Sequence, residues 1–427
     1  MTLRFGKKDE GNRADPPETS AVFDQAAELH PVAETGIEPA APQFDEPEPE
    51  PEPGQPWAPE QLRGDVSQPG PPVITVEYEA IAGSGEDSPP LVHIGPGNSL
   101  ALGVFDGLGG AGGARYAVEG TERTGAFIAS RLARAVAAAG ARMMLAPEPA
   151  QTDEETARTG EWFAAQFEEE LTRRFGEKAE SLGGPPSQIR SSLVRTLPTT
   201  VALVLAWPEI DAAVAPHEWT HRATAVWAGD SRVYLLQPES GLVQVTIDDT
   251  RAPGDAMASL VSDPPMSNCV SASDPFHLNR FMWSFTGLGV LVAATDGCFG
   301  YVSTPAHFEF ELVDTLMQAT TVSEWKAQLS GRLAAITRDD ATLAAAVIAP
   351  SFEALREALA PRHDVLLRGF IEPYRHRDEA VREAEGVVAE ARTLLERRAA
   401  ARREYGDELW SRYRGDYEKL IPPHRSD

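Results

Sequence analysis

Apolar residues recur in short runs along the middle of the chain. The runs are rich in valine, leucine and other strand-favouring residues, and their length of about four to eight residues is typical of β-strands. They cover residues 73–78, 100–105, 200–206, 224–228, 232–236, 242–246, 288–294 and 342–348. Several runs follow one another without a helical segment between them, which predicts an α+β fold and not a doubly wound parallel sheet.

A second pattern, with apolar residues three and four positions apart, predicts helices between these strands. The expected helical segments are residues 114–145, 153–175, 306–318 and 322–336. The first two lie between the second and third expected strands, so the chain leaves the strand-rich part for a long helical stretch and then returns to it.

Residues 351–427 are rich in arginine, glutamate and alanine, and one face of the helix expected there is apolar. This stripe consists of Val381, Ala384, Val388, Ala391, Leu395, Trp410, Tyr413, Tyr417 and Leu420. It sustains barely two heptads, which is too little to predict a coiled coil. We expect the stripe to pack back on the globular core, and docking into the groove of a partner is the alternative.

Residues 1–72 have a different composition. They contain 14 of the 35 prolines and 15 acidic against 5 basic residues, including an alternating Glu-Pro run. Such a segment buries too little apolar surface to offset the entropy of ordering it, so we expect a disordered acidic arm. The expected organisation is an arm at 1–72, a globular domain at 73–350 and a helical extension at 351–427.

The 427-residue chain has a formal net charge of −27. An acidic chain lacks the basic surface that nucleic acids and anionic membranes require. Its two cysteines are too few for a disulfide framework, and neither a secretory signal nor an apolar run of membrane-spanning length occurs. We therefore expect a soluble, cytoplasmic protein without a nucleic-acid or membrane partner.

Residues 107–112 match the GxGxxG motif of dinucleotide-binding proteins, because they follow an expected strand and open an expected helix. Two features weigh against a nucleotide site. No acidic residue ends a second strand about 20 residues later, where it would hold the ribose. In addition, Asp106 directly precedes the first glycine, where its carboxylate would repel a pyrophosphate. A nucleotide-binding enzyme remains an alternative.

Acidic residues lie beside glycines or turns at the ends of several expected strands. They are Glu86, Asp87, Asp106, Asp230, Asp296, Asp339 and Asp340. A single Asp-Gly pair is usually a turn, but carboxylates that meet at one sheet edge need compensating charge. Mg²⁺ and Mn²⁺ supply such charge in sites built from oxygen ligands. The pattern therefore predicts a metal site.

Six segments together resemble the metal-dependent Ser/Thr protein phosphatases of type 2C, and bacterial-type members in particular. They are GVFDGLGG at 103–110, PTTVALV at 198–204, VWAGDSRVY at 226–234, VTIDD at 245–249, VAATDG at 292–297 and DDATL at 339–343. The resemblance covers about residues 73–350 and makes this region a phosphatase-like catalytic domain. It implies a four-layer αββα sandwich, with two central sheets flanked by helices and metals in the cleft between the sheet edges.

The resemblance also implies roles for individual residues. Asp106 is expected to bridge two Mn²⁺ or Mg²⁺ ions, the Gly107 carbonyl to bind one of them, and Asp230 to bind a third, weaker ion. A water that bridges the two ions would attack the phosphorus, so the implied catalytic residues are Asp106, Asp296 and Asp339. The implied metal ligands are Glu86, Asp87, Asp106, Gly107, Asp230, Asp296 and Asp339, where the Glu-Asp pair acts directly or through water.

The sequence departs from the family at a position that concerns substrate binding. The family usually places an arginine four residues before its glutamate, where it binds the substrate phosphate in a bidentate manner, and this position is Ala82 here. Phosphate binding would then depend on the metals alone, or on another basic residue such as Arg115, Arg251 or Arg280.

The sequence thus predicts metal-dependent hydrolysis of phosphoserine and phosphothreonine in proteins. The expected partner is a phosphoprotein substrate, either a Ser/Thr kinase or one of its targets. The alternative is a regulatory or interaction module with the phosphatase fold and little turnover, because the usual phosphate-binding arginine is missing.

Overall fold

The computed structural model describes residues 70–118, 120–145, 153–183, 195–209, 214–215, 218–251, 256–261 and 265–422. The acidic arm expected at residues 1–72 lies outside the described residues, apart from its last three. Within the described part, the first strand begins at Val73 and the last helix ends at Tyr417.

Two five-stranded sheets form the centre of the fold. The first has the strand order β1 (Val73–Tyr78), β12 (Ala341–Ile348), β11 (Gly289–Ala294), β8 (Arg232–Gln237) and β9 (Gly241–Gln244). The second has the order β10 (Asn279–Thr286), β7 (Thr220–Ala228), β6 (Val201–Pro208), β3 (Leu100–Val104) and β2 (Leu91–Ile94). All neighbouring strands in both sheets are antiparallel, so the end of each strand lies beside the start of its neighbour.

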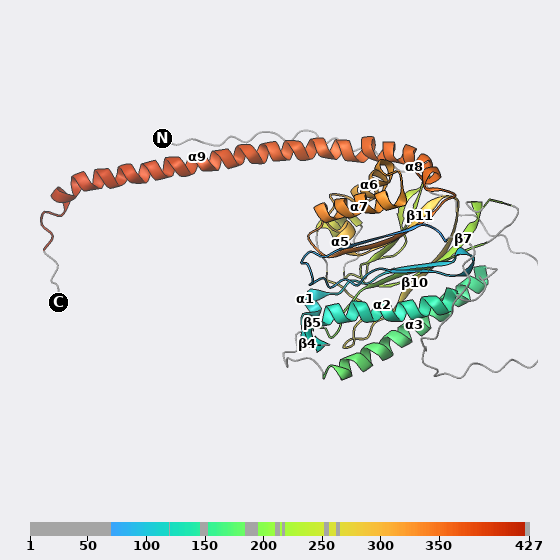
Figure 1. The fold of residues 1–427 in the computed structure, drawn as a ribbon. Helices are drawn as coiled ribbons and strands as arrows, with labels where there is room; N and C mark the ends of the chain where they lie inside the picture. Colours follow the sequence, from blue (N-terminus) through green and yellow to red (C-terminus); the bar gives the residue numbers. More distant parts are fainter. Residues whose placement is uncertain are drawn as a thin grey trace, which may run out of the picture. The chain divides into compact units, whose positions relative to one another are not determined.

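Helices cover the outer face of each sheet (Figure 1). On the side of the second sheet lie α2 (Gly125–Leu145) and α3 (Asp153–Ser181), and on the side of the first lie α6 (Pro305–Gln318), α7 (Val322–Ile336) and α8 (Phe352–Leu366). Shorter helices are α1 (Gly109–Gly112), α4 (Ala256–Val261), α5 (Asp296–Phe299) and a 3₁₀ turn at Pro96–Asn98. This four-layer αββα arrangement confirms the predicted fold class.

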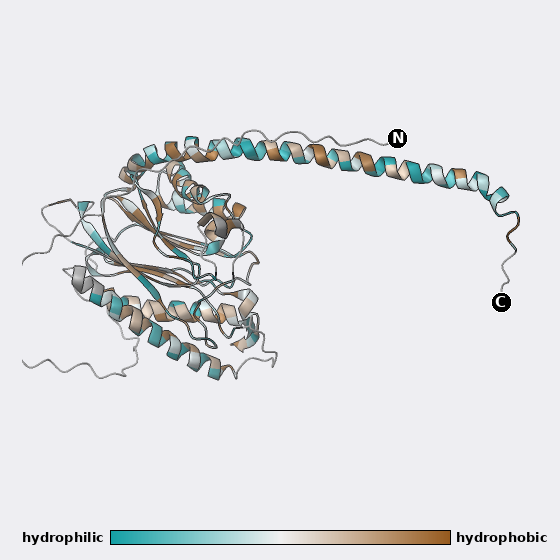
Figure 2. Cartoon of the chain, turned by 180° about the vertical axis from the view of Figure 1, so that it is seen from behind, coloured by the Kyte–Doolittle hydropathy of each residue, from teal (hydrophilic) through white to brown (hydrophobic). Residues whose placement is uncertain are grey.

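Apolar side chains fill the space between the layers, and Figure 2 shows hydrophobic residues along the strands of both sheets. Leu102, Val204 and Leu291 are fully buried between the two sheets. Trp325 of α7 is fully buried between the first sheet and its helices, and its indole N–H donates a 3.2 Å hydrogen bond to the carbonyl of Leu312. The sandwich therefore holds its loops on rigid, well-packed strands.

A β-hairpin occupies residues that the sequence predicted to begin a long helix. β4 (Arg115–Val118) pairs with β5 (Thr121–Thr124), and Gly120 at the turn adopts a φ of +80°. Glycine tolerates this left-handed conformation, and the threonines of β5 favour a strand. The predicted helix start at residue 114 is therefore wrong, and α2 begins at Gly125.

Two strands of the second sheet, β2 and β10, were missing from the predicted set. β10 contains charged and polar residues between its aromatic ones, and only Phe285 of this strand is buried. It therefore lacks the apolar run from which strands were predicted. Its place in the sheet comes from pairing with β7.

The C-terminal region continues from α8 through a π-helical turn (Leu367–Ile371) into α9 (Glu372–Tyr417). No residue of α9 is buried, and Val388 and Leu395 of the apolar stripe are 50% and 69% exposed. The expectation that this stripe packs back on the globular core is therefore wrong. Its docking to a partner stays a prediction.

No helix in the described part of the chain combines the length and the apolar composition needed to cross a bilayer. The longest, α9, carries charged residues in every turn (Figure 2).

Candidate metal centre

The loops at one edge of the two sheets carry the acidic residues singled out from the sequence. Asp106 follows β3, Asp230 lies in the turn between β7 and β8, and Asp296 follows β11. The antiparallel register brings these loops together, since Ala294 at the end of β11 pairs with Arg232 at the start of β8. The remaining candidates lie in the β1–β2 loop, directly after Asp106 and directly before β12, and are Glu86, Asp87, Gly107 and Asp339.

Four of these residues form an inner group, which we call the inner carboxylates: Asp87, Asp106, Asp230 and Asp296. The charges of the other three all act on Asp106, and the charge of Asp296 acts on Asp87 and Asp230 as well. Each inner carboxylate comes from a different loop. Only the tertiary fold therefore brings the four together.

Burial raises the pKa of Asp87 to about 7, and the nearby charge of Asp296 adds to the rise. Burial also raises the pKa values of Asp106 and Asp230 well above the ordinary range of an aspartate, and neighbouring inner carboxylates raise them further. Like charges in a desolvated site cannot all ionise without compensation. The site therefore favours a cation or bound protons.

Glu86 lies beside the inner carboxylates, and its Oε1 accepts a 2.6 Å hydrogen bond from Oγ1 of Thr124 in β5. Burial raises the pKa of Glu86, the Thr124 hydrogen bond lowers it, and the charges of Asp340 and Asp339 raise it again. Asp339 is exposed, and its Oδ1 accepts a 2.9 Å hydrogen bond from the N–H of Asp340. The structure thus brings Asp339 close to Glu86.

Two residues that support the site were not among the implied metal ligands. The Asp340 carboxylate accepts hydrogen bonds from the N–H groups of Ala80, at 2.9 Å, and Glu86, at 2.6 Å, and so fastens the β1–β2 loop. Thr295 Oγ1 donates a 3.0 Å hydrogen bond to Oδ2 of Asp87. The sequence had placed Asp340 among the acidic residues at strand ends, and no signal pointed to Thr295.

Two glycines of the acidic motifs lie very close to neighbouring groups. A Cβ at Gly109 would lie 1.8 Å from Oε2 of Glu86, and a Cβ at Gly297 would lie 1.8 Å from the carbonyl oxygen of Asp340. At position 297 the neighbour is backbone, so only glycine fits there. At position 109 a larger residue would turn the flexible Glu86 side chain away from its present place. A carboxylate therefore faces the glycine loop where a dinucleotide would place its pyrophosphate, and this speaks against the nucleotide alternative.

The chemistry of the inner carboxylates fits a hard divalent cation. Oδ1 of Asp87 and Oδ1 of Asp230 are buried and have no hydrogen-bond partner among the described residues. A buried carboxylate oxygen without a partner costs free energy unless a cation compensates it, and Mg²⁺ and Mn²⁺ prefer oxygen ligands. The described residues nevertheless contain no set of three or more His, Cys, Asp or Glu side chains already arranged around a common metal position.

The raised pKa of Asp87 predicts how the stability of the metal-free protein depends on pH. This pKa is about 7 in the folded chain against an ordinary value of 3.8, so the folded state binds the proton more tightly than the unfolded state. The free energy of unfolding should fall as the pH rises from about 4 to about 7, by at most about 1.4 kcal/mol per pH unit for each such group. Thermal melts in EDTA of the wild type and of Asp87→Asn measure this effect as the difference between two curves.

His221 contributes with the opposite sign in part of this range. Burial lowers its pKa from 6.5 to about 4, so its contribution to stability is present above pH 6.5 and is lost as the pH falls toward 4. Because the wild type and Asp87→Asn share His221, its contribution cancels in the difference. A difference that does not vary with pH would contradict the raised pKa of Asp87.

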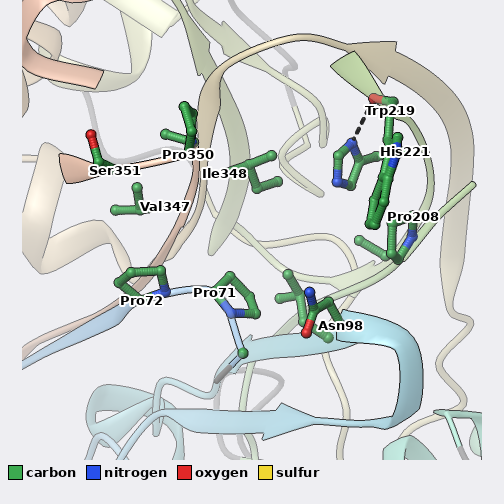
Figure 3. Close-up of a pocket in the computed structure, with 14 residues that line it drawn as sticks. Pro71, Pro72, Asn98, Pro208, Trp219, His221, Val347, Ile348, Pro350 and Ser351 are labelled. Atoms are coloured by element: carbon green, nitrogen blue, oxygen red, sulfur yellow. Dashed lines mark hydrogen bonds between the residues drawn. The ribbon is translucent and has the colours of Figure 1, made fainter. Parts of the chain in front are cut away.

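A separate cavity of about 320 Å³ lies at the opposite edge of the sandwich (Figure 3). Its lining includes Leu100 at the start of β3 and Ile348 at the end of β12, whereas Asp106 follows the end of β3. His221 also lines this cavity, and its Nδ1 forms a 3.1 Å hydrogen bond with the carbonyl of Trp219. The cavity is therefore not part of the acidic site.

Comparison with known proteins identifies similar structures. No family model and no curated protein matches the chain. The structure is similar to a serine/threonine phosphatase from Staphylococcus aureus, with 14% identity, a TM-score of 0.46 and coverage of 67% of this chain and 100% of that one. It is also similar to a bacterial serine phosphatase, with 15% identity, a TM-score of 0.44 and coverage of 66% and 99%. A sex-determining protein of C. elegans has 12% identity and a TM-score of 0.47, with 68% of each chain covered. At these values the similarity concerns overall architecture, and the chemistry of the site is inferred from this chain's own residues.

Proposed function

We propose that this chain is a metal-dependent phosphatase that hydrolyses phosphoserine and phosphothreonine in proteins. The observation that carries the proposal is the group of inner carboxylates, in which buried oxygens of Asp87 and Asp230 lack hydrogen-bond partners. Three of the segments that resemble type-2C phosphatases supply Asp106, Asp230 and Asp296, and these meet Asp87 of the β1–β2 loop at one edge of the sandwich. A metal site with this donor set suits phosphoryl transfer, because phosphoryl oxygens need neutralising charge.

In this proposal the chain's oxygens hold two Mn²⁺ or Mg²⁺ ions, and Asp230 binds a third, weaker one. When bound, such ions neutralise the phosphoryl oxygens and lower the pKa of a water that attacks phosphorus. Asp106, Asp296 and Asp339 are the proposed catalytic residues. The proposed metal ligands are Glu86, Asp87, Asp106, the Gly107 carbonyl, Asp230, Asp296 and Asp339.

The backbone around Asp106 is fixed by two threonines of the loop before β6. Thr200 Oγ1 accepts a 3.1 Å hydrogen bond from the N–H of Asp106, and Thr199 Oγ1 donates a 2.6 Å hydrogen bond to its carbonyl. A ligand that is held in place by such contacts loses little freedom when it binds an ion. These threonines therefore act as positioning residues for the proposed centre.

The test is hydrolysis of p-nitrophenyl phosphate and of a phosphothreonine peptide by the full chain. We expect turnover that requires Mn²⁺ or Mg²⁺, disappears with EDTA and resists vanadate, because no cysteine or serine nucleophile takes part. Loss of turnover in Asp106→Asn serves as the control for a contaminating phosphatase. Metal-independent turnover that vanadate inhibits would contradict the proposal.

A regulatory module with little turnover is the second candidate, and the observation that favours it is Ala82. This residue is exposed in the turn at 81–84, where the family usually supplies an arginine. Mn²⁺ binding without turnover on any phosphopeptide would support this candidate over the phosphatase. Saturable NAD binding would revive the nucleotide alternative.

A further inference from the structure

The β4–β5 hairpin, which the sequence did not predict, lies beside the acidic site. Thr124 on β5 donates the 2.6 Å hydrogen bond to Oε1 of Glu86. Arg115 on β4 is the direct cross-strand partner of Thr124. Side chains of directly paired residues lie on the same face of an antiparallel ribbon. The side chain of Arg115 therefore lies on the face of the hairpin that carries Thr124 toward Glu86.

The guanidinium of Arg115 is available for a ligand. The side chain of Arg115 is exposed, and within the described part of the chain its guanidinium forms no hydrogen bond or ion pair. A guanidinium without such a partner keeps its donors free for a ligand.

The neighbouring arginines are already engaged. Arg131 of α2 donates to the carbonyls of Glu86 and Gly85 at 3.3 and 3.4 Å, and its guanidinium stacks on Phe127. Arg123, on the other face of the hairpin, donates to the carbonyl of Gly83 at 3.2 Å. These two arginines hold the β1–β2 loop and are less free to follow a substrate.

The two other arginines considered from the sequence are placed differently. Arg280 on β10 pairs with Glu161 of α3, on the outer face of the second sheet. Arg251 is exposed next to residues outside the described part, and its backbone N–H is bonded to the carbonyl of Pro265. Of the three arginines, Arg115 is thus the one that is linked to the acidic site. It pairs across the hairpin with Thr124, which is hydrogen-bonded to Glu86.

We propose that Arg115 binds the phosphate of the substrate, in place of the arginine that is missing at Ala82. This inference rests on the proposed function and adds the residue that recognises the phosphate. A phosphate monoester dianion is repelled by a cluster of carboxylates, and a planar guanidinium can bind two of its oxygens at once. The phosphate-binding arginine thereby comes from the β4–β5 hairpin and not from the loop that carries Glu86.

The experiment compares Arg115→Met and Arg115→Lys with the wild type in the full chain. The first readout is KM and kcat for p-nitrophenyl phosphate with saturating Mn²⁺, and the second is calorimetric binding of inorganic phosphate to the Mn²⁺-loaded protein. We expect Arg115→Met to raise both KM and the Kd of phosphate at least tenfold, which corresponds to about 1.4 kcal/mol, with a smaller change in kcat. Arg115→Lys should recover part of the loss, because it keeps the charge but not the bidentate geometry.

Arg280→Met is the matched control, since it removes an exposed arginine on another face, and it should leave both values unchanged. If Arg115→Met leaves KM and phosphate binding unchanged in an active protein, the inference is wrong and the proposed function stands. The same conclusion follows if Arg251→Met, and not Arg115→Met, raises KM and the Kd of phosphate. If the wild type shows no turnover but binds phosphate, and Arg115→Met abolishes this binding, the inference stands and the proposed function fails. If the wild type shows neither turnover nor phosphate binding, both are wrong.

Discussion

Asp106→Asn should lower kcat/KM on p-nitrophenyl phosphate by about 10³-fold, and it should also raise the melting temperature of the metal-free protein. The loss of activity follows because the substitution removes the charge of Asp106, which lies close enough to the other three inner carboxylates for all their charges to act on it. Groups that stabilise charge only in the transition state have effects of this order. The gain in stability follows because asparagine has the same shape and removes one of four mutually repelling carboxyl groups.

Two measurements check this prediction, steady-state kinetics at saturating Mn²⁺ and thermal melts in EDTA. Asp364→Asn is the matched control, because Asp364 is an exposed residue of α8 that pairs with the exposed Arg368. It should change neither value appreciably. Full turnover of Asp106→Asn would show that the inner carboxylates are not the catalytic centre. A lower melting temperature in EDTA would show that their mutual repulsion does not limit stability.

Arg232→Met should lower the free energy of unfolding by about 3–5 kcal/mol. Arg232 is only 5% exposed, and its Nε and Nη2 donate to the two carboxylate oxygens of Asp248 at 2.8 and 2.6 Å. Its guanidinium also stacks on Phe299, with 4.2 Å to the ring centroid. Methionine would keep much of the apolar contact but leave Asp248 as an unpaired charge in a desolvated place. Because the charge of Asp248 also raises the pKa of Asp230, the inner carboxylates would be affected as well.

Denaturant unfolding of the metal-free protein measures this loss. The double variant Arg232→Met with Asp248→Asn should recover much of it, because no unpaired charge remains. Arg173→Met is the control, since the Arg173 side chain is 39% exposed, its partner Glu177 is exposed and its other partner Glu170 keeps a second ion pair with Arg174, so it should cost at most about 1 kcal/mol. A similar loss in Arg232→Met and Arg173→Met would mean that the buried pair contributes no more than a surface pair.

The sequence was sufficient to predict the fold class and the acidic positions at the ends of strands. Asp106 and Asp296 each follow an apolar run directly, and that pattern is local, so it needs no knowledge of what packs against it. The sequence pattern also indicated that α6 and α7 are helices. The same pattern did not predict the strand β10, because β10 is polar and exposed along most of its length. Its place in the sheet depends on pairing with β7. Pairing between distant segments leaves little trace in a local pattern.

The sequence by itself therefore determined which residue types could form an all-oxygen metal site, because a carboxylate beside a glycine at a strand end is visible in a short window. Only the tertiary structure decided which of these residues meet, because the four inner carboxylates come from loops separated by up to 209 residues. The raised pKa values of Asp87, Asp106 and Asp230 likewise arise from burial and from the neighbouring carboxylates, which a short sequence window does not show. The tertiary structure also decided that residues 115–118 and 121–124 form a hairpin that directs Thr124 toward Glu86, and that the apolar stripe of α9 remains exposed. Periodicity shows that a helix has an apolar face or that a segment is amphipathic, but what covers that face depends on how distant parts of the chain pack together.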